Sequence, residues 1–208
     1  MDFESTVLSV APVTHNVKRI MLTKHDDFSF VPGQYGLIEK KPFTFTSTPD
    51  DAHLEFTVKA VGEFSTKLTQ MKPGDTVIIS GPMGNKLNFT EDLENCVFIA
   101  GGSGITPFIA AFRYTSKRQL PHKFLLFYGN RTEKDIIYKE ELESYSNLKV
   151  VHALSEKGEH VTKDLIEKHI KDEKHTWFVC GPPPMTAAMK EILKDIGAED
   201  VRIEPWEI

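Results

Sequence analysis

The sequence predicts an N-terminal antiparallel β-barrel followed by a C-terminal α/β domain with a doubly wound, mostly parallel sheet. Up to about residue 92, short runs of β-branched and apolar residues alternate with turns rich in Pro, Gly and Asp, as in small barrels. From residue 93 onward, apolar strands alternate with helical segments, as in sheets covered by helices on both faces. The 208 residues suit two domains of about 100 residues each, 1–92 and 93–208.

The first half contains four runs with strand character and one with helix character. Alternating or clustered β-branched and apolar residues predict strands at 6–12, 17–23, 54–61 and 77–80. A helix is predicted at 65–71, with Ser65 as its N-cap because a serine hydroxyl can accept a free backbone N–H. Pro-Gly and Pro-Asp turn signals separate these elements.

The second half reads as five strands, of which the first four are each followed by a helix. Regular alternation of this kind predicts a doubly wound, mostly parallel sheet with helices on both faces. The expected strands are 96–100, 123–128, 149–154, 176–180 and 200–203, and the expected helices are 107–117, 138–145, 162–169 and 185–196.

Composition excludes several functional classes. The formal net charge is −5, so the chain lacks the basic surface that nonspecific nucleic-acid binding needs, and we expect no nucleic-acid partner. The two cysteines, Cys96 and Cys180, are too few for an iron–sulfur cluster and fit a reducing compartment, and we expect no metal site. No signal peptide and no apolar run of about 18 residues is visible, so we expect a cytoplasmic protein without membrane insertion.

A glycine-rich turn joins the strand at 96–100 to the helix that follows it. It reads Gly101-Gly102-Ser103-Gly104-Ile105-Thr106-Pro107. Glycines allow the backbone to approach a pyrophosphate closely, and the helix N-terminus offers free N–H groups and the positive end of the helix dipole. Pro107 suits the first helical turn, and Thr106 can cap the helix or touch a phosphate or a nicotinamide. The turn therefore predicts a dinucleotide site; the alternative is a tight strand-to-helix turn without a ligand.

Seven segments, taken in order, resemble the ferredoxin–NADP reductase superfamily, in particular bacterial flavodoxin/ferredoxin reductases and NAD(P)H:flavin reductases. The resemblance covers nearly the whole chain and implies a flavin-binding barrel followed by a nicotinamide-dinucleotide-binding α/β domain. The segments are K-P-F-T-F-T-S from residue 41, G-E-F-S-T-K-L from 62, P-G-D-T-V-I-I-S-G-P-M-G from 73, A-G-G-S-G-I-T-P from 100, F-Y-G-N-R-T-E-K-D-I-I-Y from 127, C-G-P-P-P-M from 180 and E-P-W from 204.

The resemblance assigns the flavin strand to Lys41-Pro42-Phe43-Thr44, where the family usually reads Arg-x-Tyr-Ser. Lys41 keeps a positive charge for the flavin phosphate but loses the bidentate guanidinium fork. Phe43 keeps a ring that packs against the flavin but loses the phenol hydroxyl. Thr44 keeps a hydroxyl where the family places one near flavin N5. Two further candidates for flavin contact are Ser47 and Val58.

Other segments are implied to complete the site. Gly62, Phe64, Ser65 and Thr66 form a loop that opens a helix, suited to the pyrophosphate of FAD rather than to FMN. Near the chain end, the resemblance implies that Glu204 helps proton movement near N5 and that Trp206 stacks on the flavin; the alternative for Trp206 is packing between domains. Around the nicotinamide the implied contacts are Gly102, Gly104, Ile105, Thr106, Pro107, Cys180, Gly181, Pro182 and Met185.

The identity of the nicotinamide donor depends on two loops at the ends of the second and third strands of the parallel sheet. The resemblance places the adenosine between Arg131 and Ser155. NADPH-dependent members often carry arginine after the serine, whereas this chain carries Glu156, which would repel a 2′-phosphate. Arg131 and Lys157 favour NADPH. On balance we expect NADH, with NADPH as the alternative.

The implied activity is that of a flavin-dependent NAD(P)H oxidoreductase, with hydride moving from nicotinamide C4 to flavin N5 and electrons then passing to a flavodoxin or ferredoxin. Thr44, Cys180 and Glu204 are the expected catalytic residues. One alternative is an NAD(P)H:flavin reductase that uses free flavin as substrate, because that branch often reads R-P-F-S where this chain reads K-P-F-T. Two others are an electron-transfer subunit of a larger complex and a nucleotide-sensing protein without turnover.

Overall fold

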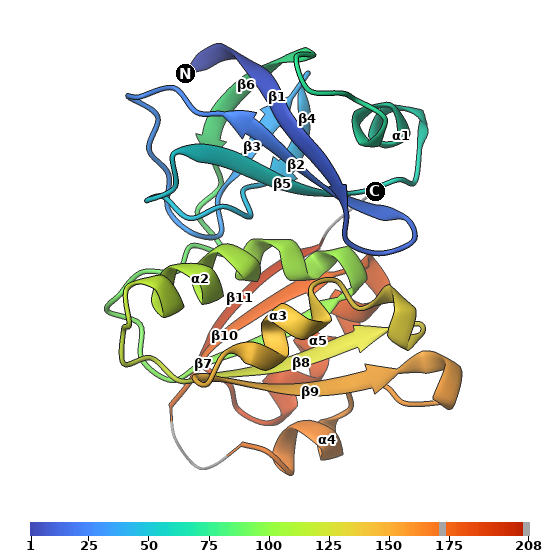
Figure 1. Ribbon diagram of the computed structural model, residues 1–208. Helices are drawn as coiled ribbons and strands as arrows, with labels where there is room; N and C mark the ends of the chain where they lie inside the picture. Colours follow the sequence, from blue (N-terminus) through green and yellow to red (C-terminus); the bar gives the residue numbers. More distant parts are fainter. Residues whose placement is uncertain (171–173, 206–208) are drawn as a thin grey trace. The chain divides into compact units, whose positions relative to one another are not determined.

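The chain, described in a computed structural model at residues 1–170 and 174–205, divides into two compact units (Figure 1). The barrel unit comprises Met1–Thr90 together with Thr106–Lys117, and the sheet unit comprises Glu91–Ile105 and Arg118–Ile208. The helix that follows the glycine-rich turn therefore groups with the barrel unit. The domain limits 1–92 and 93–208 stay a prediction.

The barrel unit is built on a six-stranded antiparallel sheet with the strand order β4-β3-β6-β1-β2-β5. The two edge strands are joined where Phe45, directly after β4, forms an antiparallel bridge with Phe56 of β5. The predicted fold class of this half is confirmed. Its strands are β1 Asp2–Pro12, β2 Val17–Thr23, β3 Tyr35–Ile38, β4 Lys41–Thr44, β5 His53–Lys59 and β6 Thr76–Met83, and its helices are α1 Glu63–Thr69 and α2 Thr106–Lys117.

A cluster of phenylalanines fills the interior of the barrel unit. Phe45 is fully buried, with its ring centroid 4.5 Å from that of Phe30, 5.2 Å from that of Phe56 and 5.6 Å from that of Phe28. Aromatic side chains bury large apolar areas, so this cluster contributes strongly to stability. It also fixes the chain immediately after β4.

Three expectations for the first half need correction. β1 begins at Asp2 rather than at residue 6, because its polar first residues pair with β6 from Asp2–Ser80 to Thr6–Thr76. β3 was not predicted, since four residues that include a glycine carry little strand signal. Ser65 is not the N-cap of α1: the cap is Gly62, and Ser65 Oγ accepts the Gly62 N–H from the third helical position at 3.1 Å.

The sheet unit contains a five-stranded, wholly parallel sheet with the order β11-β10-β7-β8-β9. This order confirms the doubly wound fold class, and all five strands begin within one residue of their predicted starts. The strands are β7 Cys96–Gly101, β8 Phe124–Asn130, β9 Leu148–Leu154, β10 Thr176–Gly181 and β11 Asp200–Pro205. The helices are α3 Lys139–Ser144, α4 Lys163–Glu167 and α5 Pro183–Asp195. The short 3₁₀ turns are η1 Gly102–Ile105, η2 Glu133–Asp135 and η3 Ser155–Lys157.

Both faces of the parallel sheet are covered. Odd-numbered side chains such as Val97 and Val179 pack in one core with Ile166 of α4 and Leu193 of α5. On the other face, Phe98 stacks on Phe178 at 5.0 Å between ring centroids. This arrangement leaves the carboxyl ends of the strands as the edge at which α/β sheets bind ligands. No helix in the described part of the chain is long and apolar enough to cross a bilayer.

Candidate functional site

In the barrel unit, β4 and the start of α1 bring the two predicted flavin segments together. Lys41 and Pro42 are exposed and Phe43 is half-buried. The ring of Phe43 lies 6.2 Å from that of Phe64, the second residue of α1. Segments some twenty positions apart in the sequence thus form one surface. Lys41 at its edge can reach solvent or an anionic group.

Thr44 carries a hydroxyl that the protein leaves available. Its residue is only 4% exposed, yet no hydrogen bond of this hydroxyl is found within residues 1–170 and 174–205. The Thr44 oxygen is not one of the buried side-chain atoms that lack a partner in the described residues, so it is accessible and open to a ligand. By contrast, Thr46, two positions along, bonds through its hydroxyl to Glu55 at 2.9 Å. Thr44 therefore fits a ligand that accepts or donates a hydrogen bond at this point.

Three other predicted flavin contacts belong to the framework around Thr44. Ser47 is 1% exposed, and its Oγ accepts the Glu55 N–H at 3.0 Å. Val58 is 1% exposed within the apolar core of the barrel unit. The Ser65 hydroxyl accepts the N–H groups of Val61 and Gly62, at 3.0 and 3.1 Å. These side chains hold the loop and strand in shape rather than presenting free polar groups.

The turn at the head of α1 is open. A Cβ added at Gly62 would meet no atom within 4 Å, and residues 61–63 are exposed. Thr66 closes the first helical turn, because its N–H donates a hydrogen bond to the Gly62 carbonyl at 2.9 Å. The backbone of Gly62 and Phe64 can therefore be approached by a phosphate group.

In the sheet unit, the glycine-rich turn has one closed and one open side. A Cβ at Gly104 would lie 2.3 Å from the carbonyl oxygen of Cys180, so this turn packs directly on the end of β10. At Gly102, where φ is +53°, a Cβ would meet nothing within 4 Å. Glycine is thus required at one position by close packing, and at the other it leaves the backbone free for a ligand. Ile105, Thr106 and Pro107, which follow, are buried.

Tyr128 is a site residue that sequence reasoning missed. It lies fully buried in β8, and its hydroxyl donates to the Gly102 carbonyl at 3.0 Å and accepts the Ile137 N–H at 3.3 Å. Burial raises the pKa of this phenol, so it stays protonated and keeps donating. The tyrosine therefore fixes the open glycine of the turn. The only sequence signal was its place at the end of an apolar strand.

The end of β10 forms the second wall of the glycine-rich turn. Met185 of α5 lies with its sulfur against Gly101 and Gly181, and Pro182 is exposed as the N-cap of α5. Cys180 is fully buried, and burial raises the pKa of its thiol, as does the negative charge of Glu204. The thiol is therefore neutral at physiological pH and is not a nucleophile.

Glu204 and Trp206, near the end of the chain, were predicted to be site residues. Glu204 pairs in register with Cys180 across the parallel strands β10 and β11 and is half-buried. Trp206 lies outside the described residues. The structure thus brings Glu204 to the cysteine at the strand end.

The buried thiols make stability depend on alkaline pH. Burial raises the pKa of Cys96 from its ordinary 9.0 to about 12, so between these values the unfolded chain loses a proton that the folded chain keeps. Because the unfolded state then binds fewer protons, each such thiol lowers the free energy of unfolding by ~1.4 kcal/mol per pH unit above pH 9. We expect Cys96→Ala to show a shallower loss of stability than the native chain in denaturant titrations from pH 8 to 10.5. Equal slopes would contradict the shift at Cys96.

The loops after β8 and β9 are joined where the adenosine was expected. The Glu156 N–H donates to the Arg131 carbonyl at 3.0 Å, and both side chains, like that of Ser155, are exposed. A cavity of about 410 Å³ beside them is lined by Thr132, Glu133, Lys134 and Glu156. A hydrogen bond from Lys139 holds the pKa of Glu133 below its ordinary value, so Glu133 is ionised. Two carboxylates and one lysine line this cavity.

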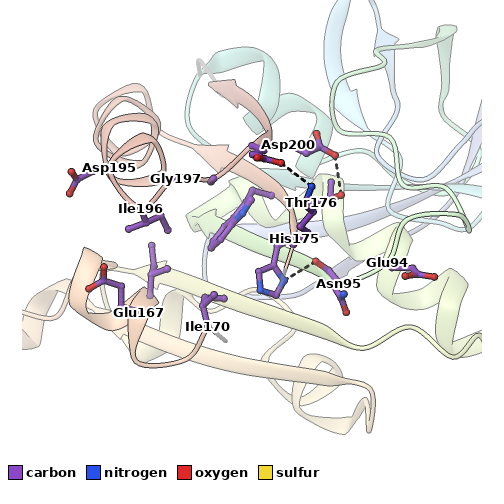
Figure 2. Close-up of a pocket in the computed structure, with 15 residues that line it drawn as sticks. Glu94, Asn95, Glu167, Ile170, His175, Thr176, Asp195, Ile196, Gly197 and Asp200 are labelled. Atoms are coloured by element: carbon purple, nitrogen blue, oxygen red, sulfur yellow. Dashed lines mark hydrogen bonds and ion pairs between the residues drawn. The ribbon is translucent and has the colours of Figure 1, made fainter. Parts of the chain in front are cut away.

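A second cavity, of about 890 Å³, contains none of the predicted site residues (Figure 2). It lies at the amino ends of β10 and β11, where Thr176 Oγ1 donates to Asp200 at 3.0 Å and His175 Nδ1 lies 3.1 Å from the Asn95 carbonyl oxygen. Ligands of open α/β sheets bind at the carboxyl ends of strands, so we assign this cavity no part in the site.

Comparison with known proteins agrees with the fold and the glycine-rich turn. Residues 98–191 match the oxidoreductase NAD-binding domain family. NADH-cytochrome b5 reductase 2 of Mycosarcoma maydis is 33% identical over 168 residues, which cover 72% of this chain and 48% of that protein. The ferredoxin–NAD(P)(+) reductase component of the naphthalene 1,2-dioxygenase system of Pseudomonas putida is 25% identical over 214 residues, covering 93% of this chain and 65% of that one.

The fold has close counterparts among solved structures. A ferredoxin NADP+ reductase from Neisseria gonorrhoeae with bound FAD and NADP superimposes with a TM-score of 0.85 at 19% identity, covering 98% of both chains. These matches support the ferredoxin–NADP reductase superfamily, which the sequence motifs predicted. It spans about half to two thirds of the length of the curated relatives named above.

Proposed function

We propose that this protein is a flavin-dependent NAD(P)H oxidoreductase that binds FAD on the barrel unit and passes electrons to a ferredoxin- or flavodoxin-type carrier. The observation that carries the proposal is the glycine-rich turn, closed against Cys180 at Gly104 and open at Gly102. The unpaired hydroxyl of Thr44 supports a flavin site, and the bound FAD and NADP of the neisserial reductase support this pair of cofactors. The naphthalene-dioxygenase relative supports a ferredoxin as acceptor.

Each candidate residue has a defined task in this proposal. When bound, nicotinamide and flavin would supply hydride transfer from C4 to N5. Thr44 would hydrogen-bond near N5, and Lys41 would neutralise a flavin phosphate. Cys180, kept neutral by burial, would border the nicotinamide without adding charge, while Glu204 would relay a proton near the strand end.

Two alternatives make different predictions about flavin retention. Use of free flavin as a substrate is favoured by Phe43, which has no hydroxyl, and by the exposure of Lys41 and Pro42, which limits what they contribute to affinity. Service as an electron-transfer subunit of a larger complex is favoured by the naphthalene 1,2-dioxygenase relative, which is the reductase component of such a system.

A visible absorption spectrum of the purified protein, followed by anaerobic addition of NADH and NADPH separately, tests the proposal. Retained flavin bands that bleach with a nucleotide support a bound-flavin reductase. A colourless protein that oxidises NADH only with added flavin supports the free-flavin alternative. A colourless protein that is inert with both nucleotides and added flavin would falsify the proposed activity.

We expect NADH to be the preferred donor, because Glu133 and Glu156 line the cavity where a 2′-phosphate would lie. Glu156→Arg removes one carboxylate and adds a cation, so the ratio of kcat/KM for NADPH to that for NADH should rise by about tenfold, or ~1.4 kcal/mol. Glu140→Arg on the exposed face of α3 is the charge-matched control and should leave the ratio unchanged. Equal responses of the two variants would show that Glu156 does not face the adenosine.

A further inference from the structure

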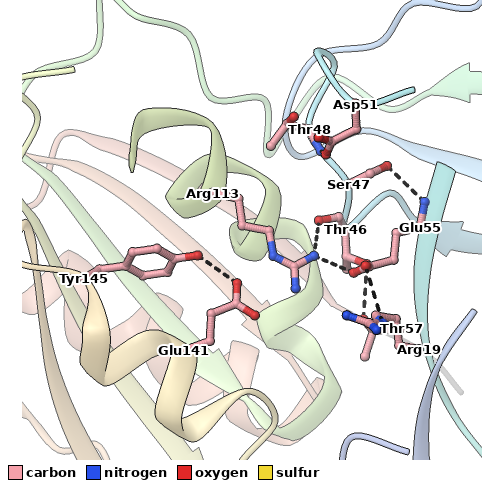
Figure 3. Close-up of polar contacts among 10 residues, drawn as sticks. All are labelled: Arg19, Thr46, Ser47, Thr48, Asp51, Glu55, Thr57, Arg113, Glu141 and Tyr145. Atoms are coloured by element: carbon pink, nitrogen blue, oxygen red, sulfur yellow. Dashed lines mark hydrogen bonds and ion pairs between the residues drawn. The ribbon is translucent and has the colours of Figure 1, made fainter. Parts of the chain in front are cut away.

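A buried ionic network in the barrel unit joins the strand segment after Thr44 to helix α2 (Figure 3). Figure 3 shows Arg113 extending from α2 toward Thr46 and Glu55. Glu55 is 4% exposed, and the side chain of Arg113 is 16% exposed. A buried carboxylate is tolerated only with hydrogen bonds and a compensating charge. Arg113 supplies both, and Arg19 adds a longer ion pair to Glu55 at 3.8 Å.

The network fixes Thr46 at three of its polar atoms. Its N–H donates to the Glu55 carbonyl at 2.7 Å, and its carbonyl accepts Arg113 Nη1 at 2.7 Å. Its hydroxyl donates to Glu55 Oε1 at 2.9 Å, and the same carboxylate oxygen accepts Arg113 Nη1. Thr57 adds a hydroxyl contact at 3.1 Å. The backbone at Thr46 is thus set by Glu55 and Arg113 together.

Thr46 lies two residues from Thr44, just beyond the end of β4 and the bridge that Phe45 forms with Phe56. Phe45 between them is locked in the aromatic core. A shift of the Thr46 backbone would therefore be transmitted to the direction of the Thr44 hydroxyl. In the chain, α2 begins at Thr106, directly after η1, so the helix that holds the flavin strand also follows the glycine-rich turn.

We propose that the Arg113–Glu55 pair is a positioning contact that sets the backbone at Thr46 and, through it, the Thr44 hydroxyl for the flavin. The inference rests on the proposed function and goes beyond it, because neither Arg113 nor Glu55 belongs to the predicted cofactor contacts. Thr44 is the binding group, and the pair acts through it.

Three variants and a matched control separate positioning from simple stability. Arg113→Met keeps an unbranched stem but leaves the Glu55 carboxylate with only the longer ion pair to Arg19, at 3.8 Å. Glu55→Gln/Arg113→Met removes both charges, so folding stability should recover relative to Arg113→Met, whereas the position of Thr46 should not. Arg113→Lys keeps the charge with fewer donors. Lys117→Met, on the same helix as Arg113, is the control. It breaks the 2.8 Å ion pair between Lys117 and Asp51, and the Lys117 side chain is 51% exposed.

The variants are compared by the dissociation constant of FAD, by the rate of anaerobic flavin reduction with NADH at full flavin occupancy, and by amide hydrogen exchange at residues 43–47 without flavin. We expect Arg113→Met and the double variant to weaken FAD binding and to slow flavin reduction, each by about tenfold, with faster exchange at 43–47. Arg113→Lys should recover part of the reduction rate, and Lys117→Met should stay within about twofold of the native protein.

A double variant that is folded and matches the native protein in FAD affinity and reduction rate would overturn the positioning role. If the native protein binds no FAD, the proposed function fails, and the exchange measurement still decides the inference. In that case faster exchange at 43–47 in Arg113→Met, but not in Lys117→Met, supports the pair as the element that orders this strand, and unchanged exchange in both contradicts it.

Discussion

Replacing Gly104 with alanine is expected to lower the free energy of unfolding of the sheet unit by about 2 kcal/mol or more. A Cβ at this position would lie 2.3 Å from the carbonyl oxygen of Cys180, 2.6 Å from its carbonyl carbon and 2.7 Å from the Gly181 nitrogen. All three are backbone atoms of a strand end, so they cannot rotate away as a flexible side chain can. The new methyl group therefore has to push η1 away from β10. Chemical denaturation of both proteins measures the loss.

Gly102→Ala is the matched control for Gly104→Ala in the same turn. It places a methyl group where no atom lies within 4 Å, and its cost comes from the positive φ of +53°, about 1–2 kcal/mol. Its methyl group points to the open side of the turn, so we expect weaker binding of the nicotinamide dinucleotide at a modest loss of stability. If Gly104→Ala were as stable as the native chain, the turn would not pack against β10 as described.

The fold was largely predictable because its information is local. Strands of the parallel sheet are near-continuous apolar runs, and β7 and β10 are buried along their whole length. The strand segments that were missed are mostly polar or very short: residues 2–5 of β1 read Asp-Phe-Glu-Ser, and β3 has four residues, one of them glycine. Both are strands because neighbouring strands supply partners. Pairing of that kind depends on tertiary structure and leaves little periodicity in the sequence.

The site was predictable in the same measure. Gly102 and Gly104 stand within a recognisable turn, so their sequence spacing indicated their role. The Arg113–Glu55 pair is separated by 58 positions, and an arginine in an amphipathic helix reads as part of a solvated face. Ser65 illustrates the converse, because a serine near a helix start predicts a cap, whereas here glycine takes that position and the hydroxyl reaches back.

Thr44→Val is expected to slow flavin reduction by NADH on the order of 10²-fold while FAD remains bound. Valine keeps the shape of threonine but removes the hydroxyl that would hydrogen-bond near N5. Because that hydroxyl has no partner in the described part of the chain, its loss should change the free energy of unfolding without flavin by less than about 1 kcal/mol. Stopped-flow reduction at saturating NADH and denaturant titration of the flavin-free protein measure the two effects.

Thr46→Val gives the reverse pattern and so serves as the control for Thr44→Val. Its hydroxyl is fully buried and bonds to Glu55 at 2.9 Å and to Thr57 at 3.1 Å, so removing it should cost about 1–3 kcal/mol of stability. Flavin reduction should fall less than in Thr44→Val, because Arg113 still holds the Thr46 carbonyl. If Thr44→Val reduced bound FAD at the native rate, the hydroxyl would have no part at N5. If Thr44→Val lost as much stability as Thr46→Val, the Thr44 hydroxyl would stabilise the fold rather than act at the flavin.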